Sequence, residues 1–151
     1  MQLHDFLTPR RIKVPIVGLD KGSVIRELVG LVVENGAGEF DDVLRAVQER
    51  ESVLSTGIGC GVAIPHGKTG RVGEIKLAAG ASPQPVAFDA LDGEPVRLFF
   101  LLIGPETSAG DHVKALSRIS RLVRRQPVRE RLLAARDAEE FFRILCDAES
   151  R

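Results

Sequence analysis

The chain has 151 residues, of which 44% are hydrophobic and 28% are charged, and its 21 Lys and Arg residues balance its 21 Asp and Glu residues. This length and composition are typical of one globular domain, and we predict a single domain over residues 1–151. A net charge of zero excludes the strongly basic character of proteins whose main task is binding nucleic acid or an anionic membrane surface.

The sequence also gives no sign of export or membrane insertion. Its two cysteines, Cys60 and Cys146, are too few for a disulfide scaffold. The N-terminus lacks the apolar core of a signal peptide, and the longest apolar run, residues 98–103, is too short to cross a bilayer. We therefore expect a cytoplasmic protein that does not insert into membranes.

The N-terminal third is predicted to contain one extended segment and two helices. Residues 11–19 favour a short edge strand, because Pro15 has no N–H to donate to a neighbouring strand. Asp20 is a good N-cap for a helix that runs to about residue 35, in which apolar residues recur at helical spacing. A second helix is expected at about 41–51.

The middle and the C-terminal third differ in character. Residues 52–73 hold six of the 15 glycines and show little helical periodicity. Residues 74–82 and 96–103 are predicted strands joined through a turn at 88–93, and the second is apolar enough to lie at the centre of a sheet. Helices are predicted at 111–125, at 128–135 after a break at Pro127, and at 137–147. This order of elements indicates an α/β (α+β) sandwich in which helices flank a mixed central β-sheet.

The segment Ser55–Lys68, STGIGCGVAIPHGK, is the densest chemical signal in the chain. Its glycines allow a turn whose N–H groups can cradle an anion. The predicted phosphate-cradling loop consists of Ser55, Thr56, Gly57, Gly59 and Gly61. His66 lies between a stiffening proline and a glycine, which predicts a ring presented outward rather than packed. The spacing fits neither a P-loop nor a dinucleotide fingerprint. An irregular loop with an ordinary surface histidine would explain the same residues.

Two further residues extend this pattern to a candidate phosphoryl site. His112 stands at the start of a predicted helix, where the positive end of the helix dipole disfavours the imidazolium and keeps the ring a neutral donor. Arg50, at the end of the second predicted helix, places a positive charge just before the glycine loop. A nucleophilic imidazole, an anion-binding loop and cationic or donor groups are what a transferable phosphoryl group requires.

These segments resemble the signature of the fructose/mannitol-type enzyme IIA family of the bacterial phosphoenolpyruvate-dependent phosphotransferase system. The matching segments are residues 50–51, 55–59, 61–68, 85–89, 92–96 and 112–117, followed by the C-terminal helices. The resemblance implies that His66 accepts a phosphoryl group on Nε2, as a tele-phosphohistidine, from a histidine phosphocarrier protein. It implies that His112 and Arg50 support the phosphorylated state. No metal-ligand set is visible, so we expect neither a metal nor a cofactor.

The family contains both sugar-transport components and stand-alone nitrogen-regulatory proteins. Chain length, residues 85–92 and the C-terminal helices resemble the regulatory branch more, so regulated target proteins are the first expected partners. The main alternative is a sugar-specific enzyme IIA subunit that passes the phosphoryl group to a IIB component. A binding module that has lost phosphoryl transfer is a third possibility.

Other interpretations of single features are weaker. Cys60 as a nucleophile beside His66 lacks a cysteine-hydrolase signature, and a zinc site of Cys60, His66 and His112 matches no established ligand spacing. A basic stripe on the helix predicted at 111–125 is expected to be a solvated face rather than a nucleic-acid surface. This stripe consists of Arg118, Arg121, Arg124 and Arg125. The residues Phe99, Phe100, Phe141 and Phe142 are expected in the core.

Overall fold

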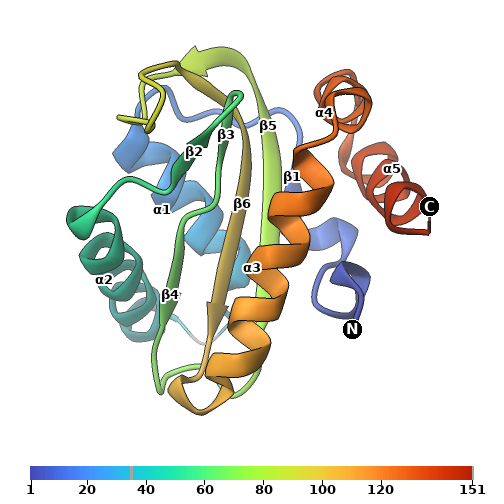
Figure 1. The fold of residues 1–151 in the computed structure, drawn as a ribbon. Coiled ribbons are helices and arrows are strands. Elements are labelled where there is room, and N and C mark those ends of the chain that lie inside the picture. The colour runs from blue at the N-terminus through green and yellow to red at the C-terminus, as the bar shows by residue number, and fades with distance from the viewer. Residues whose placement is uncertain (35, 151) are drawn as a thin grey trace.

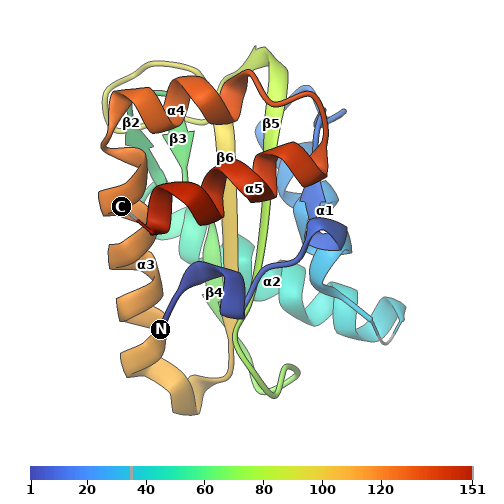
Figure 2. The ribbon, with the colours of Figure 1, turned by 90° about the vertical axis from the view of Figure 1, so that its right-hand side faces the viewer.

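A mixed β-sheet between two layers of helices forms the fold, in a computed structural model that describes residues 1–34 and 36–150. Helices α1 (Lys21–Val32) and α2 (Ala37–Val53) cover one face (Figure 1). The other face is covered by α3 (Ala109–Val123), α4 (Gln126–Leu133) and α5 (Ala138–Glu149). Figure 2 shows α4 and α5 in front of the sheet, with the N-terminal residues below α5. The predicted sandwich with a mixed central sheet is confirmed.

The sheet is built around one long central strand, β6 (Val96–Gly104). The strand order is β1-β5-β6-β3-β2, and β4 also pairs with β6. Strand β5 runs antiparallel to β6, whereas β3 and β4 run parallel to it. The other strands are β1 (Ile12–Lys13), β2 (Gly57–Gly59), β3 (Val62–Ala63), β4 (His66–Lys68) and β5 (Lys76–Val86). Three 3-10 turns, η1 (Leu3–Asp5), η2 (Pro9–Arg11) and η3 (Glu106–Ser108), complete the fold.

Strand β6 is central because it is apolar on both faces. Leu98, Phe100 and Leu102 pack in the core beneath α3, α4 and α5. The alternate residues Phe99, Leu101 and Ile103 pack in the core beneath α1 and α2. Since successive side chains of a strand point to opposite faces, an unbroken apolar run serves both layers. The predicted central position is confirmed. Strand β1 lies at an edge of the described sheet beside β5, but it spans only Ile12–Lys13, so Pro15 follows the strand and the strand expected within residues 11–19 is shorter than predicted.

The starts of α1 and α5 follow from side-chain capping. Asp20 caps α1 by accepting a hydrogen bond from the Ser23 N–H at 2.8 Å, and Asp137 caps α5 through the Glu140 N–H at 2.8 Å. Helix α4 begins at Gln126 rather than after Pro127, because a proline in the first helical turn loses no hydrogen bond.

Two boundaries near residue 35 differ from expectation. Helix α1 ends at Val32, and the predicted end near residue 35 lies outside the described residues. Helix α2 begins at Ala37 instead of residue 41, behind Gly36, which has a φ of 92° that favours glycine.

The glycine-rich middle is more regular than its sequence suggests. Residues 52–73 contain β2, β3 and β4, three strands of two or three residues each. Strands this short contain too few residues for an alternating hydrophobic pattern, which is why no strand was expected there.

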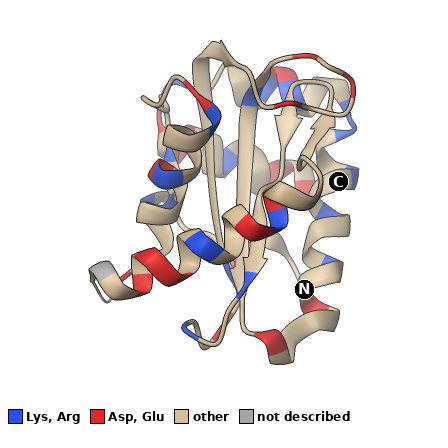
Figure 3. Ribbon diagram, turned by 90° about the vertical axis from the view of Figure 1, so that its left-hand side faces the viewer, with Lys and Arg blue, Asp and Glu red and all other residues tan. Residues whose placement is uncertain are grey.

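Charges of both signs are mixed over the helices α1 and α2 (Figure 3). This mixture agrees with the net charge of zero. Within the described ranges, every helix is too short or too polar to traverse a bilayer.

Candidate functional site

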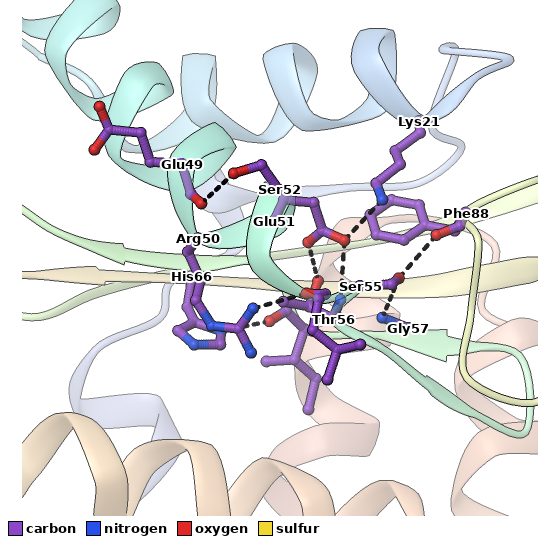
Figure 4. Close-up of polar contacts among 12 residues, drawn as sticks. Lys21, Glu49, Arg50, Glu51, Ser52, Ser55, Thr56, Gly57, His66 and Phe88 are labelled. Carbon is purple, nitrogen blue, oxygen red and sulfur yellow. Dashed lines mark hydrogen bonds and ion pairs between the residues drawn. The ribbon is translucent and has the colours of Figure 1, made fainter.

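A close approach between β4 and α2 creates the site. Gly67 of β4 lies against α2 so tightly that a Cβ atom there would stand 3.0 Å from the backbone of both Ala46 and Val47. Arg50 lies about one helical turn beyond Ala46. Contact between this strand and this helix therefore brings Arg50 beside His66, the first residue of β4 (Figure 4). Gly67 thus acts by allowing close packing between β4 and α2, whereas the sequence analysis interpreted it as part of a segment that presents the His66 ring outward.

His66 is held at one ring nitrogen. Its Nδ1 lies 2.9 Å from the carbonyl oxygen of Ile64. Because a carbonyl only accepts, Nδ1 carries the proton in the neutral ring and Nε2 keeps its lone pair. Nothing within the described part of the chain hydrogen-bonds Nε2. The ring is half-buried, so it is less open to solvent than the sequence predicted.

The environment favours the neutral form of His66. Burial is the main cause that lowers its pKa below the usual 6.5, and the positive charges of Arg50 and Lys68 lower it further. The bond to Ile64 and the negative charge of Glu51 act in the opposite direction without cancelling the effect. An imidazole that is neutral at pH 7 is a competent nucleophile.

His112 lies next to His66. It stands in the first turn of α3, and the two ring centroids are 5.6 Å apart with the ring planes at 60°. Its residue is only 2% exposed, and neither ring nitrogen has a hydrogen-bond partner among the residues that the structure describes. Burial, then the charges of His66 and Lys68, lower the pKa of His112 to about 4. The ring is therefore neutral, as expected, but burial rather than the helix dipole is the main cause.

Arg50 is fixed at the end of α2. Its Nη1 donates a hydrogen bond to the carbonyl oxygen of Leu54 at 2.7 Å. Leu54 is the C-cap residue of α2, so this bond satisfies one of the carbonyls that a helix end leaves without a partner. A guanidinium has five N–H donors, so others remain after the bond to Leu54. Its positive charge lies beside His66 (Figure 4).

Sequence reasoning did not identify Glu51 as a site residue. Its buried carboxylate accepts hydrogen bonds from the N–H of Thr56 at 2.9 Å and from the Thr56 hydroxyl, and it pairs with Lys21 at 2.8 Å. Burial raises the pKa of Glu51, but Lys21 and Thr56 lower it more, so the group is ionised at neutral pH. The sequence signals were its position next to Arg50 and the resemblance of residues 50–51 to the family signature, whereas its partner Lys21 lies thirty residues away in the chain.

The predicted phosphate-cradling loop is arranged differently from expectation. The N–H of Thr56 is bound to Glu51, and the N–H of Gly57 donates to the Ser55 hydroxyl at 3.1 Å. The Ser55 hydroxyl in turn donates to the Phe88 carbonyl at 2.9 Å. Both backbone donors are therefore used within the chain.

The other two glycines of this loop lie away from His66. Val62, directly after Gly61, pairs with Leu98 of β6, whereas His66 pairs with Leu102. Four strand residues separate these pairs, which is roughly 13 Å at about 3.3 Å per residue. Gly59 and Gly61 therefore belong to the far end of the β2–β3 hairpin and do not lie beside the imidazole.

The structure gives little support to Cys60 as a nucleophile or as a zinc ligand. Cys60 is exposed at the hairpin, where its N–H donates to Asp92 at 3.2 Å, and it does not pair with His66. Over residues 1–34 and 36–150, no three or more His, Cys, Asp or Glu side chains are grouped to hold a metal ion.

The basic stripe and the phenylalanines have structural roles. Arg118 pairs with Glu149 of α5 at 3.0 Å, and Arg125 donates to the Ala148 carbonyl at 3.2 Å, so half of the stripe holds α5. The four phenylalanines belong to the two cores or pack against them, as predicted: Phe99, Phe100, Phe141 and Phe142.

Comparisons with known proteins place the chain in a family. Residues 5–148 match the family model described as "Phosphoenolpyruvate-dependent sugar phosphotransferase system, EIIA 2". A nitrogen regulatory protein of Bradyrhizobium diazoefficiens is 35% identical over 145 residues, covering 96% of this chain and 95% of that protein. A fructose-specific EIIABC component of Bacillus subtilis is 38% identical over 148 residues, covering 96% of this chain but 23% of that longer protein.

A solved structure has a similar fold. The crystal structure of nitrogen regulatory protein IIA-Ntr from Neisseria meningitidis superimposes with a TM-score of 0.87 at 34% identity, covering 93% of this chain and 97% of that one.

Proposed function

The chain belongs to the EIIA 2 family of the phosphoenolpyruvate-dependent sugar phosphotransferase system, and from this membership we propose that His66 accepts a phosphoryl group from a histidine phosphocarrier protein. Members of the family transfer phosphoryl groups through a phosphohistidine, so the chain is a phosphotransferase component. The choice of His66 rests on the bond between its Nδ1 and the Ile64 carbonyl, which directs the lone pair to Nε2.

The proposed step exchanges one nitrogen–phosphorus bond for another. The Nε2 lone pair of His66 attacks the phosphorus of the donor phosphohistidine. As the new bond forms, the old bond breaks and its electron pair returns to the donor imidazole. The proton of His66 stays on Nδ1 throughout, hydrogen-bonded to the Ile64 carbonyl oxygen. Phosphoryl transfer of this kind depends mainly on alignment and charge stabilisation.

Arg50 and His112 are suited to support the transferred group. Arg50 supplies a fixed positive charge beside His66, which favours a dianionic phosphoryl group. His112 supplies a neutral ring with an N–H group. Its buried ring nitrogens have no hydrogen-bond partner among the described residues, which costs free energy, and a role in holding the phosphoryl group would explain why this cost is tolerated. A neutral His112 also avoids competition with His66 for a proton.

We further propose a regulatory role, in which the phosphorylation state of His66 controls partner proteins. The support is the similarity to nitrogen regulatory proteins along nearly the full length of both chains. Phosphorylation adds about −1.5 to −2 charges at one place on a protein whose net charge is zero. The similarity to the fructose-specific EIIABC component favours a second candidate, in which the acceptor is a IIB component.

Labelling tests the phosphoacceptor assignment. The protein is incubated with radiolabelled phosphoenolpyruvate, enzyme I and the phosphocarrier protein, and the label is located by mass spectrometry under alkaline conditions. We expect label on His66 in the wild type and none in His66→Ala, with circular dichroism confirming that the variant is folded. Persistent labelling of His66→Ala would refute the assignment.

A chase separates the two roles. Labelled protein is mixed with a fructose-type IIB domain, and the loss of label is followed with time. A regulator should keep its label, whereas rapid transfer to the IIB domain would replace the regulatory proposal with the transport one.

A further inference from the structure

The contacts of Glu51 exceed what an ordinary helix-end residue needs. Its carboxylate accepts two hydrogen bonds from one residue, Thr56, and also pairs with the Lys21 ammonium. Lys21 lies in addition over the ring of Phe88, 4.9 Å from its centroid. The buried carboxylate is therefore fixed from two sides, although it does not reach His66 itself (Figure 4).

A continuous path of side-chain and backbone hydrogen bonds leads from Glu51 to His66. Thr56 gives its N–H and its hydroxyl to Glu51, and its carbonyl oxygen accepts a bond from the N–H of Ile64 at 2.9 Å. The carbonyl of Ile64 then accepts the bond from Nδ1 of His66 at 2.9 Å. Pro65 follows Ile64, and its own carbonyl is bound by the N–H of Leu102 at 3.0 Å. Ile64 is thus fixed on both sides.

We propose that Glu51 is a positioning residue for phosphoryl acceptance. Through Thr56 and Ile64 it fixes the carbonyl that holds the Nδ1 proton of His66, and this directs the nucleophilic lone pair to Nε2. The inference rests on the proposed function, because it concerns the same imidazole. It adds a residue that touches neither the phosphoryl group nor the reacting nitrogen.

Two substitutions at Glu51 separate hydrogen bonding from charge. In Glu51→Gln, the amide oxygen can still accept from the Thr56 N–H and from Lys21, and the amide nitrogen can donate to the Thr56 hydroxyl. Glu51→Ala removes every one of these bonds. If Glu51 acts by position, the glutamine variant keeps most of the activity and the alanine variant does not.

Glu49 provides the matched control. It lies on the same helix, and its side chain is exposed and points away from the cluster, while its backbone carbonyl accepts a hydrogen bond from the Ser52 hydroxyl at 2.7 Å (Figure 4). Glu49→Gln removes one negative charge from the same helix end without touching the path to His66. We expect it to behave as the wild type.

The first measurement is the tautomer of His66 in the unphosphorylated protein, read from the ¹⁵N chemical shifts of its two ring nitrogens. We expect the Nδ1–H form in the wild type, Glu51→Gln and Glu49→Gln, and a mixture of both tautomers in Glu51→Ala. This spectrum requires no phosphoryl donor. It therefore tests the positioning role even if the proposed function fails, which would be seen as absence of label on wild-type His66.

The second measurement is the labelling rate as a function of phosphocarrier concentration. We expect Glu51→Ala to lower the maximal rate about 10- to 100-fold while the KM for the phosphocarrier stays within about twofold, since misplacement of a reacting group affects the chemical step. Glu51→Gln should stay within about threefold of the wild type. An alanine variant with the wild-type rate and tautomer overturns the proposal, and so does a glutamine variant as slow as alanine.

A third variant covers the case in which Glu51→Ala does not fold. Thr56→Val removes the hydroxyl bond to Glu51 but keeps the backbone bonds of Thr56. We expect an intermediate loss of maximal rate, about three- to tenfold, together with partial loss of the Nδ1–H form. An unchanged rate and spectrum in folded Thr56→Val would count against the path through Thr56 and would overturn the proposal.

Discussion

The imidazole rings of His66 and His112 lie with their centroids 5.6 Å apart, one on β4 and the other in the first turn of α3. Both rings are removed from solvent enough that burial lowers the pKa of each, and Lys68 lowers both further. The pair is therefore neutral at pH 7. One ring offers a lone pair and the other offers a hydrogen bond, without repulsion between two cations.

The pH dependence of labelling should reflect the lowered pKa of His66. Burial is the largest cause of this lowering. An unperturbed imidazole is half protonated at about pH 6.5, so the His66 ring should stay mostly neutral, and therefore nucleophilic, at that pH. After correction for the donor's own titration, we expect the labelling rate to decrease on the acid side with a midpoint below pH 6.5. An NMR titration of the His66 ring measures the same pKa directly. A midpoint at or above 6.5 in that titration would contradict the geometry of the site.

His112 should make the stability of the fold depend on pH. The unfolded chain binds a proton at this residue near pH 6.5, whereas the folded chain binds it only near pH 4, because burial lowers its pKa. The unfolded state therefore binds more protons between these values, and stability is lost as pH falls from 6.5 towards 4. The loss amounts to about 3 kcal/mol at most.

Urea unfolding at several pH values between 4 and 7.5 measures this effect. The free energy of unfolding should depend less steeply on pH in His112→Gln than in the wild type, by about one proton between pH 4 and 6.5. Parallel curves for the two proteins would show that His112 is not the group responsible.

Arg50 should be needed for phosphoryl transfer rather than for folding. Arg50→Lys keeps the charge but loses the planar donor set that binds Leu54 and faces His66. We expect the labelling rate to fall about 100-fold, as when one donor to a developing negative charge is removed. Arg45→Ala is the matched control, because Arg45 lies on the same helix and is exposed, where it pairs with Asp42. Equal rates in the two variants would remove Arg50 from the mechanism.

Gly67→Ala should damage both the packing and the site. A Cβ atom would stand 3.0 Å from the backbone of α2, so β4 and α2 must move apart, at a cost of about 1–3 kcal/mol in unfolding free energy. The same movement separates Arg50 from His66, and labelling should slow. Gly70→Ala is the control, since nothing lies within 4 Å of its added Cβ. Thermal unfolding and labelling of both variants give the comparison.

Cys60→Ser should leave labelling unchanged. The thiol is exposed at the β2–β3 hairpin, and the bond from its N–H to Asp92 does not involve the sulfur. The wild-type labelling rate is expected in the serine variant and in protein treated with a thiol-blocking reagent. A large loss in both would restore a chemical role for this cysteine.

Sequence reasoning succeeded where the signal was local. Asp20 and Asp137 predicted the starts of two helices because capping involves residues within one turn, and the apolar run in β6 predicted the central strand. It failed for β2, β3 and β4: β3 and β4 gain their order from pairing with distant β6, and β2 gains its order from pairing with β3, rather than from their own patterns. The same limit explains why Gly67 and Glu51 were misread or missed, since their partners Ala46 and Lys21 are distant in the sequence.

One consequence follows from how β6 ends. His66 is paired with Leu102 near the end of that strand, and His112 follows a short connection from its last residue, Gly104. The two rings are therefore tied to one buried strand that also pairs with β5. Separating them requires the loss of core packing, so the amide of Leu102 should exchange with deuterium only through global unfolding. If the protein exchanges phosphoryl groups with more than one partner, as proposed, the spacing of the two imidazoles stays constant in each complex.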